Sequence, residues 1–319
     1  MNAKSNKKIL LLGDFFLDEF FKGTSDRLSP EAAVPVIKYQ SSKVSLGGTG
    51  NVLANLVNLK NEVVPIGVLG DDIVSNKILS LIKKKKINTK YFLIKKNYKG
   101  ILKKRILIKN QHVARIDYED DSSNLTKAEE KKINLKIRTL IKQASIMIIS
   151  DYGKNSLNEN IIKYAIKISR KNNVISIVDP SKTLKNYSCY SGADFITPNL
   201  LELRNLYLKL DNENKDIVEA CKNLKKKYRF KNIIVTRGEK GITLFNKHLT
   251  KHFISKVKSV FDVSGAGDTV VSVLATCINM KMNILSSIHY ANKAGGHVVS
   301  LIGTQPISYK KFNEIIKLW

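Results

Sequence analysis

The chain has little cysteine. Its three cysteines, Cys189, Cys221 and Cys277, are far apart among 319 residues, and no CxxC pair occurs. The sequence therefore excludes a disulfide scaffold and a zinc ribbon. His248 and His252 are four residues apart, as on a zinc-binding helix, but the glutamate of HExxH is missing. The residues between them predict a turn between strands, and we expect no metal there.

Long apolar runs are also absent. The run Ile9–Leu12 near the N-terminus is broken by Gly13 and Asp14, too early for the core of a secretion signal. No later segment is long and apolar enough to cross a bilayer. We therefore expect a cytoplasmic protein without a membrane partner.

Acidic residues and arginine are scarce beside lysine. There are 55 Lys and Arg against 27 Asp and Glu, a formal net charge of +28, yet only eight of the cations are arginine. Such an excess is typical of nucleic-acid-binding proteins, but bidentate reading of phosphates and bases favours arginine. The run Lys83–Lys86 lacks interleaved aromatic residues and lies near the end of an expected helix, where cations suit the dipole. We interpret the lysines as solvated surface and keep nucleic-acid binding as the alternative of a different class.

The remaining composition is that of an ordinary folded protein, with 43% hydrophobic and 8% aromatic residues. Short apolar runs alternate with segments of helical period, which predicts an α/β fold with a central, mostly parallel sheet flanked by helices. The expected strands are 8–12, 63–69, 146–150, 174–178, 195–197 and 232–236, and the expected helices are 52–59, 73–84, 127–143, 158–171 and 217–228. We expect a single domain over residues 1–319.

Two segments, about 19–45 and 100–118, depart from this alternation of strands and helices. They contain alternating or β-branched stretches, such as 34–39 and 102–109, with no helix between them. We interpret them as a small β-sheet lid over a cleft. Ligands of open α/β sheets bind at the carboxyl ends of the strands. The polar residues expected there are Asp14, Asp18, Asp71, Ser150, Asp151, Asp179, Asn199, Thr236 and Arg237.

The strongest chemical signal is Gly265-Ala266-Gly267-Asp268, directly before the helical segment 269–277. Small residues let the backbone approach a ligand, and a helix N-terminus offers N–H groups to an anion such as a transferring phosphoryl group. Asp268 is then suited to accept a proton from an attacking hydroxyl. The alternative is a plain loop in which Asp268 complements the helix dipole. Neither a Walker loop nor a complete GxGxxG is present.

Four motifs resemble those of the ribokinase-like (PfkB) carbohydrate kinases, and they occur in the family's order. Residues 262–269 resemble the C-terminal signature, and 47–51 with Gly70 resemble the N-terminal signature. Residues 197–202 are similar to the NxxE element, and 236–241 to the nucleotide-binding turn. The resemblance implies a ribokinase-like fold and an ATP-dependent sugar kinase.

The resemblance also implies roles for individual residues. Asp268 would be the base, beside an anion cradle of Gly265, Ala266 and Gly267. Sugar hydroxyls would be bound by Asp14, Asp18, Gly47, Gly48 and Asn51. The ATP site would comprise Asn199, Glu202, Thr236, Arg237, Gly238, Gly241 and Asn292, with Mg²⁺ held by Asn199 and Glu202 through water.

Within the family, residues 13–18, 27–36, 105–117 and 150–154 most resemble the branch that phosphorylates D-glycero-β-D-manno-heptose 7-phosphate at its C1 hydroxyl, for ADP-heptose and lipopolysaccharide core synthesis. This implies a homodimer through the lid and, since the chain ends at Trp319, a kinase without an adenylyltransferase domain. Candidates for the distal phosphate are Lys103, Arg105, Arg115 and Arg27, and strand alternation puts Lys103 and Arg105 on one face. The alternative acceptor is a hexose phosphate, a pentose or a nucleoside.

One departure from the family pattern concerns a lysine. The family's Asp-Pro-Lys-Gly stands here as Asp179-Pro180-Ser181-Lys182, with the lysine one place later.

Overall fold

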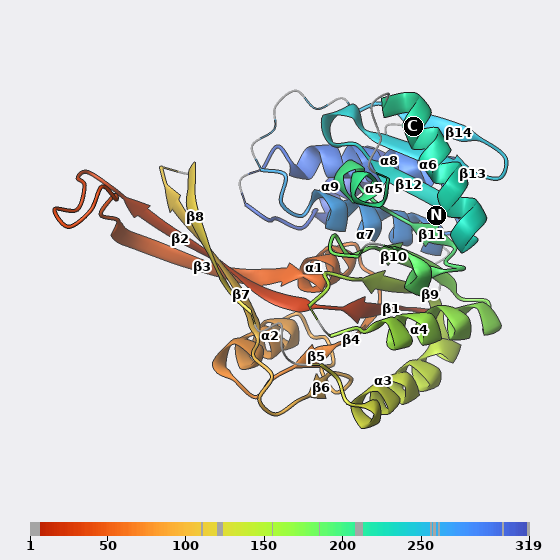
Figure 1. The fold of residues 1–319 in the computed structure, drawn as a ribbon, viewed down its shortest axis with the longest axis horizontal. Helices are drawn as coiled ribbons and strands as arrows, with labels where there is room; N and C mark the ends of the chain where they lie inside the picture. Colours follow the sequence, from red (N-terminus) through yellow and green to blue (C-terminus); the bar gives the residue numbers. More distant parts are fainter. Residues whose placement is uncertain are drawn as a thin grey trace.

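The computed structural model describes residues 7–109, 111–119, 124–154, 156–184, 186–207, 213–255, 257, 260, 262–301 and 303–317. At its centre is an eight-stranded sheet in the order β14-β13-β12-β11-β10-β9-β1-β4, covered by helices (Figure 1). The parallel strands are β1 (Lys8–Gly13), β4 (Val63–Ile66), β9 (Ala144–Ser150), β10 (Ile175–Asp179), β11 (Phe195–Ile196) and β12 (Asn232–Thr236). The antiparallel strands β13 (Ile242–Asn246) and β14 (Thr250–Phe253) complete one edge. The predicted α/β class is confirmed.

The sheet is buried on both faces, and β1 shows why its run is continuously apolar. Ile9 and Leu11 belong to one core cluster, whereas Leu10 and Leu12 belong to the other. The first cluster includes residues of α1 (Thr49–Asn58), α2 (Ile73–Lys84), α7 (Ala266–Asn279), α8 (Ile284–Val298) and α9 (Tyr309–Lys317). The second includes residues of α3 (Lys127–Leu140), α4 (Glu159–Lys171), α5 (Leu200–Leu206) and α6 (Glu213–Tyr228).

A second sheet extends away from the body (Figure 1). Its order is β3-β2-β7-β8, with β2 (Phe15–Thr24), β3 (Lys38–Gly48), β7 (Ile101–Ile108) and β8 (Gln111–Tyr118). Most of the predicted lid segments lie in this sheet, whereas residues 25–37 form the connection between β2 and β3, and Asn110 is outside the described residues. β2 begins already at Phe15 and β3 continues to Gly48, so the lid strands start and end inside the body. The four strands are called the lid below.

Two strand predictions need correction. The segment 63–69 is two strands, β4 and β5 (Val68–Leu69), and β5 pairs with β6 (Leu93–Ile94) in a separate small sheet. The break falls at Gly67, where a Cβ would lie 2.8 Å from the carbonyl oxygen of Gly13 and close to the Phe15 ring. Residues 34–37 are not in a strand, because β3 begins at Lys38.

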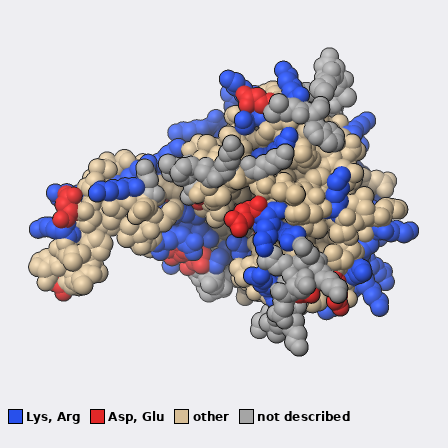
Figure 2. Space-filling model, turned by 90° about the horizontal axis from the view of Figure 1, so that it is seen from above, with Lys and Arg blue, Asp and Glu red and all other residues tan. Residues whose placement is uncertain are grey.

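The basic excess is spread over the molecule. Figure 2 shows lysine and arginine side chains on both the lid and the body, with acidic side chains in a few places on the same face. Within the described part of the chain, no helix has the length and hydropathy needed to span a membrane.

Candidate active site

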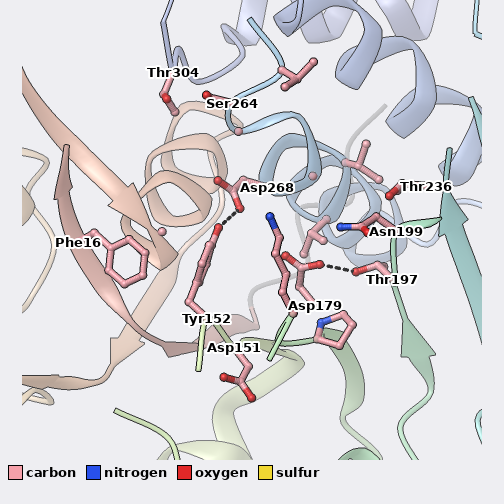
Figure 3. A pocket seen from close by; sticks show the side chains of 18 of the residues that line it. Phe16, Asp151, Tyr152, Asp179, Thr197, Asn199, Thr236, Ser264, Asp268 and Thr304 are labelled. Atoms are coloured by element: carbon pink, nitrogen blue, oxygen red, sulfur yellow. Dashed lines mark hydrogen bonds between the residues drawn. The ribbon is translucent and has the colours of Figure 1, made fainter. Parts of the chain in front are cut away.

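A cavity of about 560 Å³ lies between the lid and the carboxyl ends of the strands. Lid residues lining it include Phe16, Asp18, Gly48, Lys103, Arg105 and Arg115, and body residues include Asp151, Tyr152, Asp179, Lys182, Thr197, Asn199, Glu202, Thr236, Gly265, Gly267 and Asp268. Figure 3 shows Asp268 and Tyr152 in the middle, with Phe16 on one side and Asn199 and Thr236 on the other. The cavity therefore has a lid end and an opposite end, with Asp268 between them.

Both carboxylate oxygens of Asp268 accept hydrogen bonds from side chains. Asn51 Nδ2 donates to Oδ2 and Tyr152 Oη donates to Oδ1, each at 2.7 Å. Figure 3 shows the bond from Tyr152. Burial raises the pKa of Asp268 above its usual value, and the two hydrogen bonds oppose that rise. Asp268 is thus a fixed carboxylate with increased basicity, as a general base requires.

The predicted anion cradle is the start of α7. No side chain caps this helix, and Gly265 and Gly267 line the cavity. Gly265 has φ of 79°, and a Cβ there would lie 2.5 Å from Asn51 Nδ2, so a larger residue would displace a partner of Asp268. The N–H of Ala266 donates to Val263 O at 3.3 Å, so this N–H already has an acceptor within the loop, and Gly267 is the exposed residue of the three.

The lid end of the cavity is rich in cations. Arg105 forms an ion pair with the buried Asp18 across the parallel pair β2–β7, and its guanidinium also lies 5.3 Å from the centre of the Phe20 ring. Lys103 Nζ lies 4.6 Å from the centre of the Phe16 ring. Arg115 makes two hydrogen bonds to Asp117, at 2.8 and 2.9 Å.

Lys103 and Arg105 both line the cavity. This agrees with the prediction that the alternation of side chains along their strand places them on the same face. Gly47 is beside Asp18, and a Cβ there would collide with the Asp18 carboxylate. Arg27 lies in an exposed loop of the lid and is not part of the lining.

Asp14 differs from its expected placement. It is fully buried, does not line the cavity, and accepts backbone hydrogen bonds from Tyr152, Lys154 and Ser156 at 3.0, 3.3 and 3.0 Å. Burial raises the pKa of Asp14, and these donors oppose the rise. Its carboxylate therefore organises the chain after β9 in this structure and does not face the predicted sugar hydroxyls.

The opposite end of the cavity contains Asn199 and Glu202, which form the capping box of α5. Asn199 Oδ1 accepts from the N–H of Glu202 at 2.9 Å, and Glu202 Oε2 accepts from the N–H of Asn199 at 2.8 Å. Burial raises the pKa of Glu202 to about 6. Asp179, which accepts a hydrogen bond from Thr197 Oγ1 at 2.9 Å, has a pKa raised by burial and then by the charge of Glu202.

These oxygen donors fit a divalent cation. The charge of Glu202 raises the pKa of the buried Asp179, so a cation near both carboxylates would stabilise their ionised forms. Mg²⁺ prefers oxygen ligands and keeps several waters. Among the described residues no three His, Cys, Asp or Glu side chains could ligate one ion together. Binding through water, as predicted for Asn199 and Glu202, is compatible with that arrangement.

Four predicted ATP residues lie outside the cavity lining, and Thr236 lies within it. Arg237 is buried and its Nη1 donates to Thr243 Oγ1 at 3.3 Å, which directs it toward β13. Asn292 Nδ2 donates to Phe253 O and Ile254 O at 3.2 and 3.0 Å and so fastens the end of β14 to α8. Gly241 has φ of 90° and a tight approach to Phe253 O, whereas Gly238 borders open space. The geometry of Arg237 and Asn292 does not support direct nucleotide contacts.

The lining residues that were not among the predicted site residues include Tyr152, Asp179 and Lys182. Asp179 was noted as a polar residue at a strand end, and that position was the available signal. Tyr152 follows the end of β9 by two residues, but an aromatic residue there is equally typical of a core. Lys182 was seen only as a departure from a family pattern.

Comparison with known proteins shows the family to which the chain belongs. Residues 7–311 match the profile of the pfkB family carbohydrate kinases. The chain is 37% identical over 310 residues to the bifunctional protein HldE of Aliarcobacter butzleri, covering 96% of this chain and 63% of that protein. With HldE of Campylobacter fetus subsp. fetus the identity is 36% over 307 residues, covering 96% and 66%. The chain thus spans less than two thirds of the length of these relatives.

Solved structures show the same fold at low sequence identity. Phosphofructokinase-2 of Escherichia coli in complex with potassium has a TM-score of 0.81 at 16% identity, covering 98% of this chain and 99% of the other. Ribokinase of Arabidopsis thaliana with ribose and ATP has a TM-score of 0.74 at 17% identity, with the same coverage. The predicted ribokinase-like fold is confirmed. Because the family profile spans nearly the whole chain and the relatives align along its length, this chain belongs to the pfkB family of carbohydrate kinases.

Proposed function

We propose that this kinase transfers the γ-phosphate of ATP to the C1 hydroxyl of D-glycero-D-manno-heptose 7-phosphate and forms heptose 1,7-bisphosphate, a precursor of ADP-heptose. The observation that carries the proposal is the trio Lys103, Arg105 and Arg115 at the lid end of the cavity. An acceptor with a phosphate at its far end would meet these cations while its reacting end faces Asp268. The similarity to HldE proteins over the same residues supports this acceptor over other sugars.

The chain's own residues account for the proton transfer. Asp268 takes the proton of the C1 hydroxyl as the oxygen attacks the γ-phosphorus in line. Asn51 and Tyr152 hold the carboxylate in one orientation, so little reorganisation is needed during the reaction. The start of α7, at Gly265 and Gly267, stabilises the negative charge on the phosphoryl oxygens.

Asn199, Glu202 and Asp179 would hold Mg²⁺ through water at the opposite end. When bound, the ion neutralises charge on the ATP phosphates. We also propose a homodimer through the lid, because β3 and β8 are sheet edges and apolar side chains on the lid, such as Tyr39 and Ile116, are exposed.

The test is a panel of acceptors assayed for ADP release with the purified chain: heptose 7-phosphate, a hexose phosphate, a pentose and a nucleoside. We expect heptose 7-phosphate to have the highest kcat/KM. Asp268→Asn should lower its kcat by about 10² to 10⁴ while ATP still binds. A higher kcat/KM for another sugar would show that this other sugar is the acceptor. Near-normal turnover by Asp268→Asn would show that Asp268 is not the catalytic base.

A binding protein without enzymatic activity is the alternative of a different class. It would bind DNA or RNA in a salt-dependent manner near physiological ionic strength and turn over no sugar in the panel.

A further inference from the structure

We propose that Lys182 is the cation that holds the γ-phosphoryl group of ATP beside Asp268, an inference that rests on the proposed positions of ATP and the base in this cavity. Lys182 lies in the loop after β10 and contributes to the cavity lining. Of the described cationic residues in that lining, Lys103, Arg105 and Arg115 come from the lid, and Lys182 comes from the body. It is therefore the lining cation that does not depend on the lid.

The loop directs Lys182 toward the cavity because Ser181 is anchored in the body. Ser181 is 1% exposed, and its N–H donates to Tyr190 Oη at 3.0 Å. Tyr190 Oη in turn donates to Asp151 Oδ2 at 2.6 Å. A lysine at position 181 would have to fit into this buried network. In this chain the residue that reaches the cavity is the lysine one place later.

Lys182 faces acidic groups without being bound to them. Its positive charge opposes the rise in pKa of Asp179, Glu202 and Asp268, so its ammonium group is near all three carboxylates. Its Nζ nevertheless forms neither an ion pair within 4 Å nor a hydrogen bond with any residue that the structure describes, and the residue is exposed. A lysine ammonium with three donors and no fixed partner is available to an incoming anion.

The position also explains how a polyphosphate can enter an acidic cavity. Asp179 lies on the side of Asn199, the proposed ATP end, and Asp268 lies between the two ends (Figure 3). Glu202 is at the same end, because it is hydrogen-bonded to Asn199. A γ-phosphoryl group moving toward Asp268 would be repelled by these carboxylates unless a cation accompanied it. Arg237, one of the predicted ATP-site residues, is directed to Thr243. We therefore assign the cation that accompanies the γ-phosphoryl group to Lys182.

The decisive experiment compares the binding of ATP and ADP by titration calorimetry, with Mg²⁺ present and no sugar. Lys182→Ala should weaken ATP binding about tenfold or more and leave ADP binding nearly unchanged, since only ATP carries the group that Lys182 holds. Lys182→Arg should recover part of the ATP affinity. Lys167→Ala, which removes an exposed lysine of α4 outside the cavity lining, is the matched control and should resemble the wild type.

Turnover gives a second readout. With whichever sugar the wild type phosphorylates, Lys182→Ala should lower kcat about a hundredfold with little change in the acceptor KM. Equal losses of ATP and ADP affinity, or no loss of either, would overturn the inference. If Lys182→Ala does not fold, Lys182→Gln, which keeps most of the side chain, is measured in the same way. Failure of the heptose assignment alone would leave the difference between ATP and ADP intact.

Discussion

At the scale of single residues, the site is built around the two donors to Asp268. Tyr152 and Asn51 come from segments far apart in the sequence, yet each donates to one oxygen of the same carboxylate. Tyr152 is also packed edge to face against Phe16, with ring centres 4.9 Å apart. Its hydroxyl is therefore held by its own packing, and we regard Tyr152 as a positioning residue for the base.

Tyr152→Phe tests this role. The hydrogen bond from Tyr152 lowers the pKa of Asp268, so its loss raises that pKa, while Asn51, Asp18 and Lys182 still face the carboxyl. Because the reaction needs the ionised base, kcat should fall about tenfold near pH 6 and less near pH 8. Rate profiles between these pH values measure the effect. A uniform loss of kcat at every pH would instead indicate a packing role.

Two aspartates show what the sequence could not distinguish. In the sequence, Asp14 and Asp18 both closely follow the apolar run 8–12, and both were expected at the end of that strand, although Asp18 lies within β2. Only the folded chain reveals that Asp14 is enclosed by the loop after β9 while Asp18 faces the cavity with Arg105. The position of Asp268 in the cavity, in the first turn of α7, was predictable because a glycine-rich stretch before a helix has a local chemical meaning.

At the scale of elements, the periodicity of the sequence predicted the helices well, but it did not predict which elements contact one another. The expected helix 73–84 agrees with α2, because its apolar spacing and its cap at Asp72 lie within the segment itself. The pairing of β2 with β7 brings together Asp18 and Arg105, which are 87 residues apart. No local pattern encodes such a pairing, so the ion pair at the lid end could not be predicted.

Asn292→Ala distinguishes an element contact from a nucleotide contact. Asn292 donates to two carbonyl groups at the end of β14, and its loss leaves them without that donor. We expect a loss of about 1–3 kcal/mol in the free energy of unfolding, with the KM for ATP little changed. Urea denaturation and initial-rate kinetics give the two values. A large rise in the KM for ATP with an unchanged free energy of unfolding would instead support the predicted contact between Asn292 and the nucleotide.

At the scale of the whole molecule, the net charge of +28 would attract ATP and the proposed sugar phosphate, which are both anions. Cations are spread over lid and body (Figure 2), and a field of one sign raises the encounter rate of oppositely charged ligands. The effect is long-range and therefore sensitive to salt, unlike the direct contacts in the cavity.

Raising the ionic strength from about 0.05 to 0.3 M should lower kcat/KM for ATP and for the sugar phosphate severalfold, because screening shortens the range of the field. The value of kcat should change little, since the bound substrates are held at short range. Initial rates at several salt concentrations, with the melting temperature as a control for stability, provide the test. A parallel fall in kcat and kcat/KM would argue against steering.

The position of Asp14 has a mechanical consequence. β1 ends at Gly13 and β2 begins at Phe15, so Asp14 is the one residue between this strand of the body and the first strand of the lid. Its carboxylate also anchors the backbone of Tyr152, Lys154 and Ser156. Through this one carboxylate, the junction where β1 passes into the lid strand β2 is tied to the segment that carries Tyr152, which donates to Asp268. Lid and base therefore share an attachment point, and a change at position 14 would disturb both.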